Sequence, residues 1–307
     1  MELKGKIVFS SGKTGDYDIW TLDLTSKELK QLTFGDFWND CPKWSPDGKK
    51  IIFVSNRTGT PEIWMMDEDG KNEMRITDTN RWHNTPDWSP DGTNIVFCAN
   101  YDGNIDIYTK NIDGSNLEKI TDYEGMDFTP HFSPDGKTLI FTSQRSGNDD
   151  IWTYTFVTKE LKQLTTYKEK DYFPIYSPDG SQIAFVCGET SLSGGENLEI
   201  YLMDKDGQNR RRITRNSGAD RYVAWSPDGK LLIYASSRPG ALDEKLMVMD
   251  LTQIRESKIN FDRSPLEKEI DVEVVGFGLL KVLPKSFLRN AYPSHYFGTE
   301  RYPDWKF

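Results

Sequence analysis

Ser45-Pro46-Asp47-Gly48 is the first of five copies of one tetrapeptide in this 307-residue chain; the others are Ser89-Pro90-Asp91-Gly92, Ser133-Pro134-Asp135-Gly136, Ser177-Pro178-Asp179-Gly180 and Ser226-Pro227-Asp228-Gly229. Successive copies begin 44, 44, 44 and 49 residues apart. A fixed period of this size is typical of solenoids, arrays and propellers. The repeat therefore sets the architecture before any single motif is considered.

Each copy lies between two short apolar runs, which predicts a strand, a tight turn and a second strand. Proline presets φ in the turn, and glycine supplies the positive φ that lets the chain reverse. A second hairpin follows in each period, for example residues 62–67 and 74–77 around Glu68-Asp69-Gly70. Four strands in about 44 residues match one blade of a β-propeller.

The sequence thus predicts a single all-β domain over residues 1–307, a six-bladed β-propeller with four antiparallel strands in each blade. Blade 1 is expected at about residues 7–33 together with 302–307, and the later blades are expected to start near residues 42, 86, 130, 174 and 223. A closed ring has no open sheet edge between its first and last blades.

Two segments outside the regular repeat carry further expectations. Tyr302-Pro303-Asp304-Trp305 matches the pattern of Thr85-Pro86-Asp87-Trp88, so we expect the C-terminal strand to pair into blade 1 and close the ring. Residues 251–301 are too long for an ordinary connection and too apolar for disorder. We interpret them as an extension specific to this protein.

Composition narrows the functional classes. The formal net charge of −10 disfavours a phosphate backbone as partner, so we expect no nucleic acid. The three cysteines have neither metal-ligand spacing nor a disulfide pattern. The N-terminus lacks the apolar core of a signal peptide, and no apolar run is long enough to span a membrane. We therefore expect a soluble cytoplasmic protein, or a periplasmic or secreted one if the chain is a trimmed mature form; the oligomeric state stays open.

The repeat resembles that of the TolB-like, or PD40 (WD40-like), β-propeller family. The resemblance lies in Trp44-Ser45-Pro46-Asp47-Gly48-Lys49, in Glu62-Ile63-Trp64 and in Ile76-Thr77, and it covers about residues 1–250 plus the last strand. TolB itself carries a separate N-terminal domain and a signal peptide, which are not recognisable here. Related propellers accompany prolyl-oligopeptidase-like peptidases, but the chain has no Gly-x-Ser-x-Gly motif, which excludes a complete serine peptidase.

Polar residues recur where each inner strand begins. In a propeller these places surround one mouth of the central channel, and the residues that occupy them are Asn39, His83, Asp127, Asp171, Asp220 and Glu300. Converging carboxylates repel one another, shift their pKa values or hold a cation. One interpretation is therefore a divalent cation held by Asp127, Asp171 and Asp220.

A structural interpretation of the same residues stays open. Aspartate and asparagine form local turns at the starts of strands. They also pair with arginines from neighbouring loops, here Arg57, Arg145 and Arg238. Both interpretations can hold at once.

Aromatic residues recur at two kinds of position. Beside the polar ring stand Trp38, Trp82, Phe128 and Tyr172, which either stack on a sugar or peptide or cover the loop bases. At the same place in successive third strands stand Trp20, Trp64, Tyr108, Trp152 and Tyr201, which we expect to pack blade against blade.

These residues are compatible with two functional hypotheses. The leading hypothesis is a non-enzymatic propeller that binds a protein, a peptide or a small-molecule or glycan ligand at the channel mouth. The rival is a metal-dependent carbohydrate-active enzyme, a lyase or hydrolase, that uses the acidic ring. A metal-dependent oligogalacturonate lyase has a similar propeller with clustered histidines, and this chain offers His83 and His295 without an evident cluster.

Overall fold

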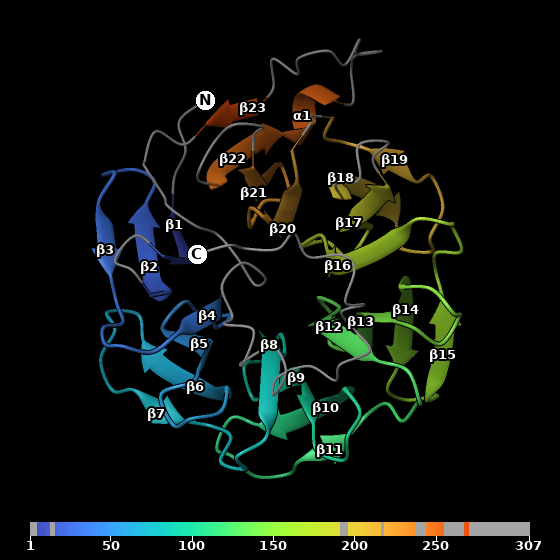
Figure 1. The fold of residues 1–307 in the computed structure, drawn as a ribbon. Helices are drawn as coiled ribbons and strands as arrows, with labels where there is room; N and C mark the ends of the chain where they lie inside the picture. The colour runs from blue at the N-terminus through green and yellow to red at the C-terminus, as the bar shows by residue number, and fades with distance from the viewer. Residues whose placement is uncertain are drawn as a thin grey trace, which may run out of the picture.

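The computed structural model describes residues 5–12, 16–190, 196–215, 218–237, 244–254 and 267–269. Their strands form six antiparallel sheets around a common axis, which confirms the predicted all-β six-bladed β-propeller (Figure 1). One short helix is described, α1 Leu251–Ile254. No helix in this described part of the chain is long and apolar enough to cross a membrane.

Strands that follow one another in sequence pair within a blade, and the first strand of blades 2 to 6 lies nearest the axis (Figure 1). Blade 1 contains β1 Lys6–Ser11, β2 Asp18–Asp23 and β3 Leu29–Gln31. Blade 2 contains β4 Asn39–Trp44, β5 Lys50–Ser55, β6 Glu62–Asp67 and β7 Met74–Arg75. Blade 3 contains β8 Trp82–Trp88, β9 Asn94–Asn100, β10 Asp106–Asn111 and β11 Glu118–Lys119.

The remaining blades follow the same order. Blade 4 contains β12 Asp127–Phe132, β13 Thr138–Ser143, β14 Asp150–Thr155 and β15 Glu160–Gln163. Blade 5 contains β16 Lys170–Tyr176, β17 Gln182–Thr190, β18 Glu196–Asp204 and β19 Arg211–Arg212. Blade 6 contains β20 Asp220–Trp225, β21 Leu231–Ser237, β22 Glu244–Asp250 and β23 Glu267–Glu269. The strand β23 comes from the long segment that we interpreted as an extension.

The Ser-Pro-Asp-Gly repeats form the turn between the first and second strands of a blade. In blade 2 the Asp47 carboxylate accepts hydrogen bonds from Ser45 Oγ at 2.7 Å and from the Lys49 N–H at 3.1 Å. Gly48 takes a φ of 71°, which glycine adopts without a steric penalty. The same two bonds recur in the other four copies, which confirms the predicted hairpin.

Side-chain packing joins the first and last blades. Residues 302–307, predicted to supply the inner strand of blade 1, lie outside the described residues, so that pairing stays a prediction. Phe9 and Trp20 of blade 1 share a buried cluster with Ala235, Leu246 and Val248 of blade 6. Equivalent clusters at other seams contain the third-strand aromatics Trp64, Tyr108, Trp152 and Tyr201, which confirms their predicted packing role.

In blades 1 to 5, a buried acid in the strand before the last one fixes the end of the last strand. In blade 1 the Thr33 hydroxyl accepts the Ile19 N–H at 2.8 Å and donates to Asp18 Oδ1 at 2.9 Å. The same acid–threonine contact occurs at Glu62–Thr77, Asp106–Thr121, Asp150–Thr165 and Glu199–Thr214. Because the threonine precedes the connection to the next blade, this bond fixes where the next inner strand begins.

The inner strands of blades 2 to 6 each have a bulge near their start, where one residue takes a φ between 47° and 58°; these residues are Cys41, Thr85, Thr129, Phe173 and Tyr222. In blade 2, Asp40 Oδ1 accepts hydrogen bonds from the Cys41 N–H at 2.7 Å and from the Ser10 hydroxyl. In blade 3 the side chain of Asn84 makes the same bond to the following N–H, also at 2.7 Å. Asp40 is buried, and this burial raises its pKa to about 7.

The substitution Asp40→Asn is expected to stabilise the protein at high pH. The folded chain keeps the Asp40 proton up to about pH 7, whereas the unfolded chain releases it near 3.8, so native stability falls as the pH rises between these values. Asparagine already stands at this place in blade 3. We expect a gain in the free energy of unfolding of about 2 to 4 kcal/mol at about pH 8.5 and far less at about pH 4, measured by urea denaturation.

The reciprocal substitution Asn84→Asp is the matched control, because it places the same acid at the same bulge of blade 3. It is expected to lose more stability at about pH 8.5 than at about pH 4. An Asp40→Asn effect of equal size at both pH values would contradict the raised pKa of Asp40.

Candidate functional site

Antiparallel strands place the two ends of every blade on opposite faces of the ring. We call one face the connector face, because it carries the segments that join each fourth strand to the next inner strand, such as residues 32–38 and 120–126. The other is the turn face, which carries the Ser-Pro-Asp-Gly turns. The predicted site residues that the structure describes all belong to the connector face.

The described members of the polar ring stand at equivalent places. Each is the first or second residue of an inner strand, and each is fully buried: Asn39, His83, Asp127, Asp171 and Asp220. Glu300, the sixth predicted member, lies outside the described residues. These five side chains are therefore closed off from solvent.

Every one of these ring residues has a partner from its own blade. Arg57 donates to Asn39 Oδ1 at 3.0 Å, and Arg145 donates to Asp127 Oδ2 at 2.7 Å, as the structural interpretation predicted. The corresponding contacts in the other three blades are Tyr101 to His83 at 2.8 Å, Arg210 to Asp171 at 3.0 Å and Ser236 to Asp220 at 2.5 Å. Arg238, the third predicted arginine, lies outside the described residues.

Burial makes the ring acids harder to ionise. It raises the pKa of Asp171 to about 6, and the attraction of Arg210 offsets only part of that rise. Burial also raises the pKa of Asp127 in spite of Arg145. The third-strand acids Asp106 and Asp150 have raised pKa values for the same main reason. Each arginine thus compensates a carboxylate that two blades have removed from water.

Among the described residues, one group of three acids is close enough together to hold a metal ion: Asp102, Asp106 and Asp122. The Lys119 ammonium already lies at 2.8, 3.0 and 2.7 Å from these carboxylates, so a lysine compensates their charge. The group contains no member of the polar ring. A cation at Asp127, Asp171 and Asp220 stays a prediction.

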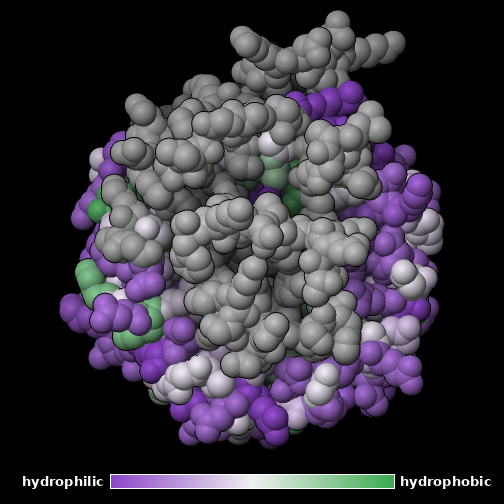
Figure 2. All heavy atoms as spheres, in the orientation of Figure 1, coloured by the Kyte–Doolittle hydropathy of each residue, from purple (hydrophilic) through white to green (hydrophobic). Residues whose placement is uncertain are grey.

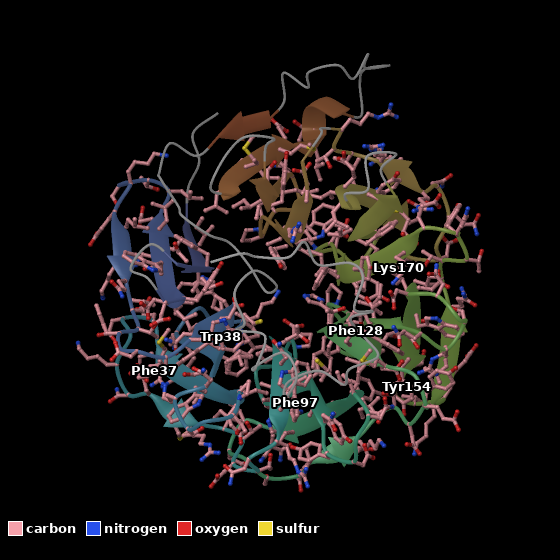
Figure 3. All side chains as sticks on the ribbon, viewed as in Figure 1. Phe37, Trp38, Phe97, Phe128, Tyr154 and Lys170 are labelled. Atoms are coloured by element: carbon pink, nitrogen blue, oxygen red, sulfur yellow. The ribbon has the colours of Figure 1, made fainter. Side chains whose placement is uncertain are left out.

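The aromatic residues beside the ring cover the bases of the connections. Trp38 packs with Tyr17, Cys41 and Val54 in a buried cluster. Trp82 is buried in the next cluster, against which the half-buried Phe128 packs, and Tyr172 is half-buried at a third. Figure 3 shows Trp38 and Phe128 close to the inner strands, whereas Phe37 lies further from the axis, over blade 2.

Three arginines form stacks that the sequence did not reveal. The guanidinium of each lies between a third-strand aromatic and an aromatic of the preceding connection. The Arg57 guanidinium carbon lies 4.6 Å from the ring centroid of Trp64 and 4.6 Å from that of Phe37. For Arg145 the distances are 5.2 Å to Trp152 and 5.5 Å to Tyr123. For Arg210 they are 4.7 Å to Tyr201 and 3.8 Å to Tyr167. We call these three assemblies the arginine columns.

Two of the arginine columns, and one neighbouring phenylalanine, have aromatic side chains at the surface. Tyr123 is 38% exposed, Tyr167 is 47% exposed, and Phe34, in the same connection as Phe37, is 66% exposed. Figure 2 shows that the rim of the molecule is mostly hydrophilic, with a few hydrophobic side chains over blades 1 and 2. The sequence signal for the arginine columns is weak, because the spacing of the connection aromatic varies. Tyr123 and Tyr167 lie four residues before their ring acids, but Phe37 lies only two residues before Asn39.

Comparisons with known proteins agree with the repeat. The family model PD40, described as the TolB beta propeller domain, matches residues 4–99, 79–192 and 157–264. Over 63 residues the chain is 44% identical to the Tol-Pal system protein TolB of Desulfosudis oleivorans, a match that spans 20% of this chain and 14% of that protein.

Two solved structures illustrate the likeness. TolB from Acinetobacter baumannii superimposes with a TM-score of 0.73 at 28% identity, over 82% of this chain and 62% of that one. The oligogalacturonate lyase of Vibrio parahaemolyticus superimposes with a TM-score of 0.53 at 17% identity, over 87% and 72% of the two chains, which shows a shared fold alone. The matches to the two TolB proteins span 14% and 62% of those proteins, which is less than two thirds of the length of either one. Because the family model matches most of the chain, from residue 4 to residue 264, the protein belongs to the TolB β-propeller family.

Proposed function

We propose that the chain is a non-enzymatic propeller that binds a protein or peptide at its connector face, around the channel mouth. The observation that supports this proposal is the set of exposed aromatics, Phe34, Tyr123 and Tyr167, on the connections between blades. Aromatic side chains dominate the binding energy of protein interfaces because they bury a large area at a small entropic cost. A hydrophilic surround keeps such a surface soluble.

Rigid support favours binding at these positions. The guanidiniums of Arg145 and Arg210 lie under Tyr123 and Tyr167, and each is held by a buried aspartate. An aromatic ring fixed in this way loses little further freedom when a partner covers it. The relative named as a Tol-Pal system protein is consistent with a role among protein partners. By the same likeness we favour the periplasmic alternative over the cytoplasmic one.

Phe34, Tyr123 and Tyr167 are expected to anchor a bound peptide. We expect peptides selected from a displayed random library on the immobilised protein to bind in solution, with affinity measured by fluorescence anisotropy. The triple variant Phe34→Ser, Tyr123→Ser, Tyr167→Ser is expected to weaken that binding by at least about tenfold. The reason is that truncating an aromatic anchor typically costs about 2 kcal/mol of binding free energy.

A matched control removes exposed apolar side chains elsewhere. Met74 and Leu161 are 45% and 40% exposed on the outer strands of blades 2 and 4. The variant Met74→Ser, Leu161→Ser is expected to bind as the wild type does. Failure of the library to enrich any sequence, or equal loss in both variants, would count against a binding site on the connector face.

The rival enzyme requires a divalent cation at Asp127, Asp171 and Asp220. Since Arg145 and Arg210 already pair with two of these carboxylates, we expect Mn²⁺ and Ca²⁺ to leave the thermal midpoint unchanged. A bound ion would stabilise the folded state by about 2.7 kcal/mol at a hundred times its Kd. A saturable rise in the midpoint that disappears in the triple Asp→Asn variant would support the lyase or hydrolase alternative.

A further inference from the structure

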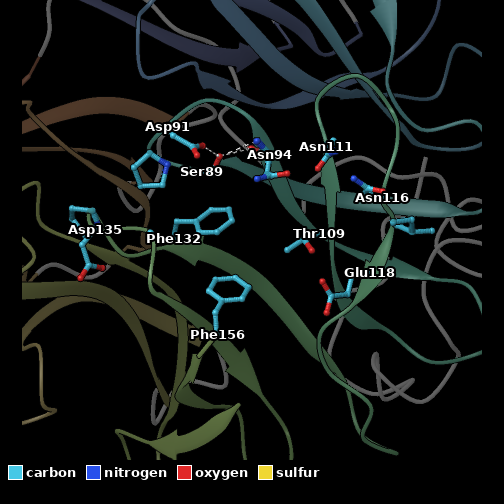
Figure 4. Close-up of a pocket in the computed structure, with 14 residues that line it drawn as sticks. Ser89, Asp91, Asn94, Thr109, Asn111, Asn116, Glu118, Phe132, Asp135 and Phe156 are labelled. Carbon is cyan, nitrogen blue, oxygen red and sulfur yellow. Dashed lines mark hydrogen bonds between the residues drawn. The ribbon is translucent and has the colours of Figure 1, made fainter. Parts of the chain in front are cut away.

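The turn face has a groove of about 810 Å³ between blades 3 and 4. Phe132 and Phe156 of blade 4 form one side, and Thr109 and Glu118 of blade 3 lie across from them (Figure 4). The Ser-Pro-Asp-Gly turns of both blades contribute to the lining, and the rest of it consists of Asn94, Asn111, Asn116 and Leu117. The groove is thus at the opposite end of the blades from the arginine columns.

The groove opens where the protein departs from its own repeat. In blades 2, 3, 5 and 6 the last position of the inner strand carries a large polar-tipped aromatic: Trp44, Trp88, Tyr176 and Trp225. The indole of Trp88 reaches across its seam and donates to the Lys43 carbonyl at 3.2 Å. Blade 4 has Phe132 at this position, which is smaller than tryptophan and has no N–H. The seam between blades 3 and 4 is therefore less filled than its neighbour.

The charge at this seam also departs from the repeat. The fourth-strand position of Glu118 is occupied in the other described blades by Lys30, Met74, Lys162, Arg211 and Lys268. The second-strand position of Asn94 is occupied in blade 2 by Lys50, which pairs with Asp67. Blade 4 thus has a lysine, Lys162, at the position of Glu118, and blade 2 has a lysine, Lys50, at the position of Asn94. Blade 3 has neither of these cations and has an acid, Glu118, in place of one of them.

The result is an acidic groove with an aromatic wall. Its lining contains Asp91, Glu118 and Asp135 and neither lysine nor arginine. In the described part of the chain, the Glu118 carboxylate has neither a hydrogen bond nor an ion pair. The rings of Phe132 and Phe156 are stacked, with centroids 5.9 Å apart and planes 20° apart.

We propose that this groove binds an arginine side chain of a basic peptide segment in a partner protein. The planar guanidinium stacks on aromatic faces and forms paired hydrogen bonds with a carboxylate, so it matches both the phenylalanine wall and Glu118. The aliphatic part of the side chain packs against the same wall. Asp91 and Asp135, each held in its turn by a serine hydroxyl, add negative potential, of which the Lys137 ammonium at 3.7 Å from Asp135 offsets a part.

This inference does not rest on the proposed function, because the groove and the exposed aromatics of the connector face share no residue. A variant of one surface leaves the other intact. The two proposals therefore fail independently.

The test uses an acetylated tetra-arginine peptide and its neutral citrulline counterpart, titrated calorimetrically into the full chain. We expect saturable binding of the arginine peptide and none of the citrulline peptide. Glu118→Lys and Phe132→Trp are each expected to weaken binding by at least about tenfold, because the first removes the counter-charge and the second fills the groove. Both changes install residues that other blades of this protein carry at the same positions, so the fold is expected to persist.

Glu28→Lys is the matched control, since Glu28 is exposed on the turn face of blade 1 and the change in net charge is the same. It is expected to change the affinity by less than about twofold, as a distant surface charge does. Lack of saturable binding, equal binding of both peptides, or equal weakening by Glu28→Lys and Glu118→Lys would overturn the proposal. Undiminished binding by a folded Phe132→Trp variant would also overturn it.

Discussion

A carboxylate sealed between two blades needs a cationic or hydrogen-bonding partner, because an uncompensated buried charge costs several kcal/mol. Asp127 and Asp171 are fully buried at the start of their inner strands, and Arg145 and Arg210 are the cations that reach them. To do so, each guanidinium crosses the face of a third-strand aromatic and leaves its outer face to a tyrosine of the connection. The exposure of Tyr123 and Tyr167 is thus a consequence of how the interior compensates its charges.

The fold was predictable because its determinants are local. Ser45, Asp47 and Gly48 specify a hairpin through contacts within four residues, and five copies of that hairpin at a regular period specify a ring of blades. The start of each inner strand was predictable as a polar position for the same reason. The partners of these positions were only partly predictable. Arg145 lies 18 residues from Asp127 in a recurring motif, whereas Arg210 reaches Asp171 from 39 residues away, in a different hairpin.

The repeat also serves as an internal reference, which a single sequence otherwise lacks. Where all blades agree, as in the acid–threonine contact, the residues maintain the architecture. At the seam between blades 3 and 4, Phe132 and Glu118 both differ from the residues at the same positions of other blades. Because the other blades fold without these two residues, the architecture does not require the change. The sequence did not reveal the groove, because these two residues belong to different blades and only the packing of the blades brings them to one surface.

The two candidate surfaces differ in the force that would hold a partner. Arg57, Arg145 and Arg210 of the arginine columns have only 10–15% of their side chains exposed and are already paired, so they offer little charge to a ligand. Binding there depends on apolar contact with Phe34, Tyr123 and Tyr167, which salt screens weakly. The groove of the turn face presents carboxylates to solvent on a chain with a net charge of −10, so attraction of a cation there weakens as ionic strength rises. The same ring of blades thus supports a salt-tolerant surface at one end and a salt-sensitive one at the other.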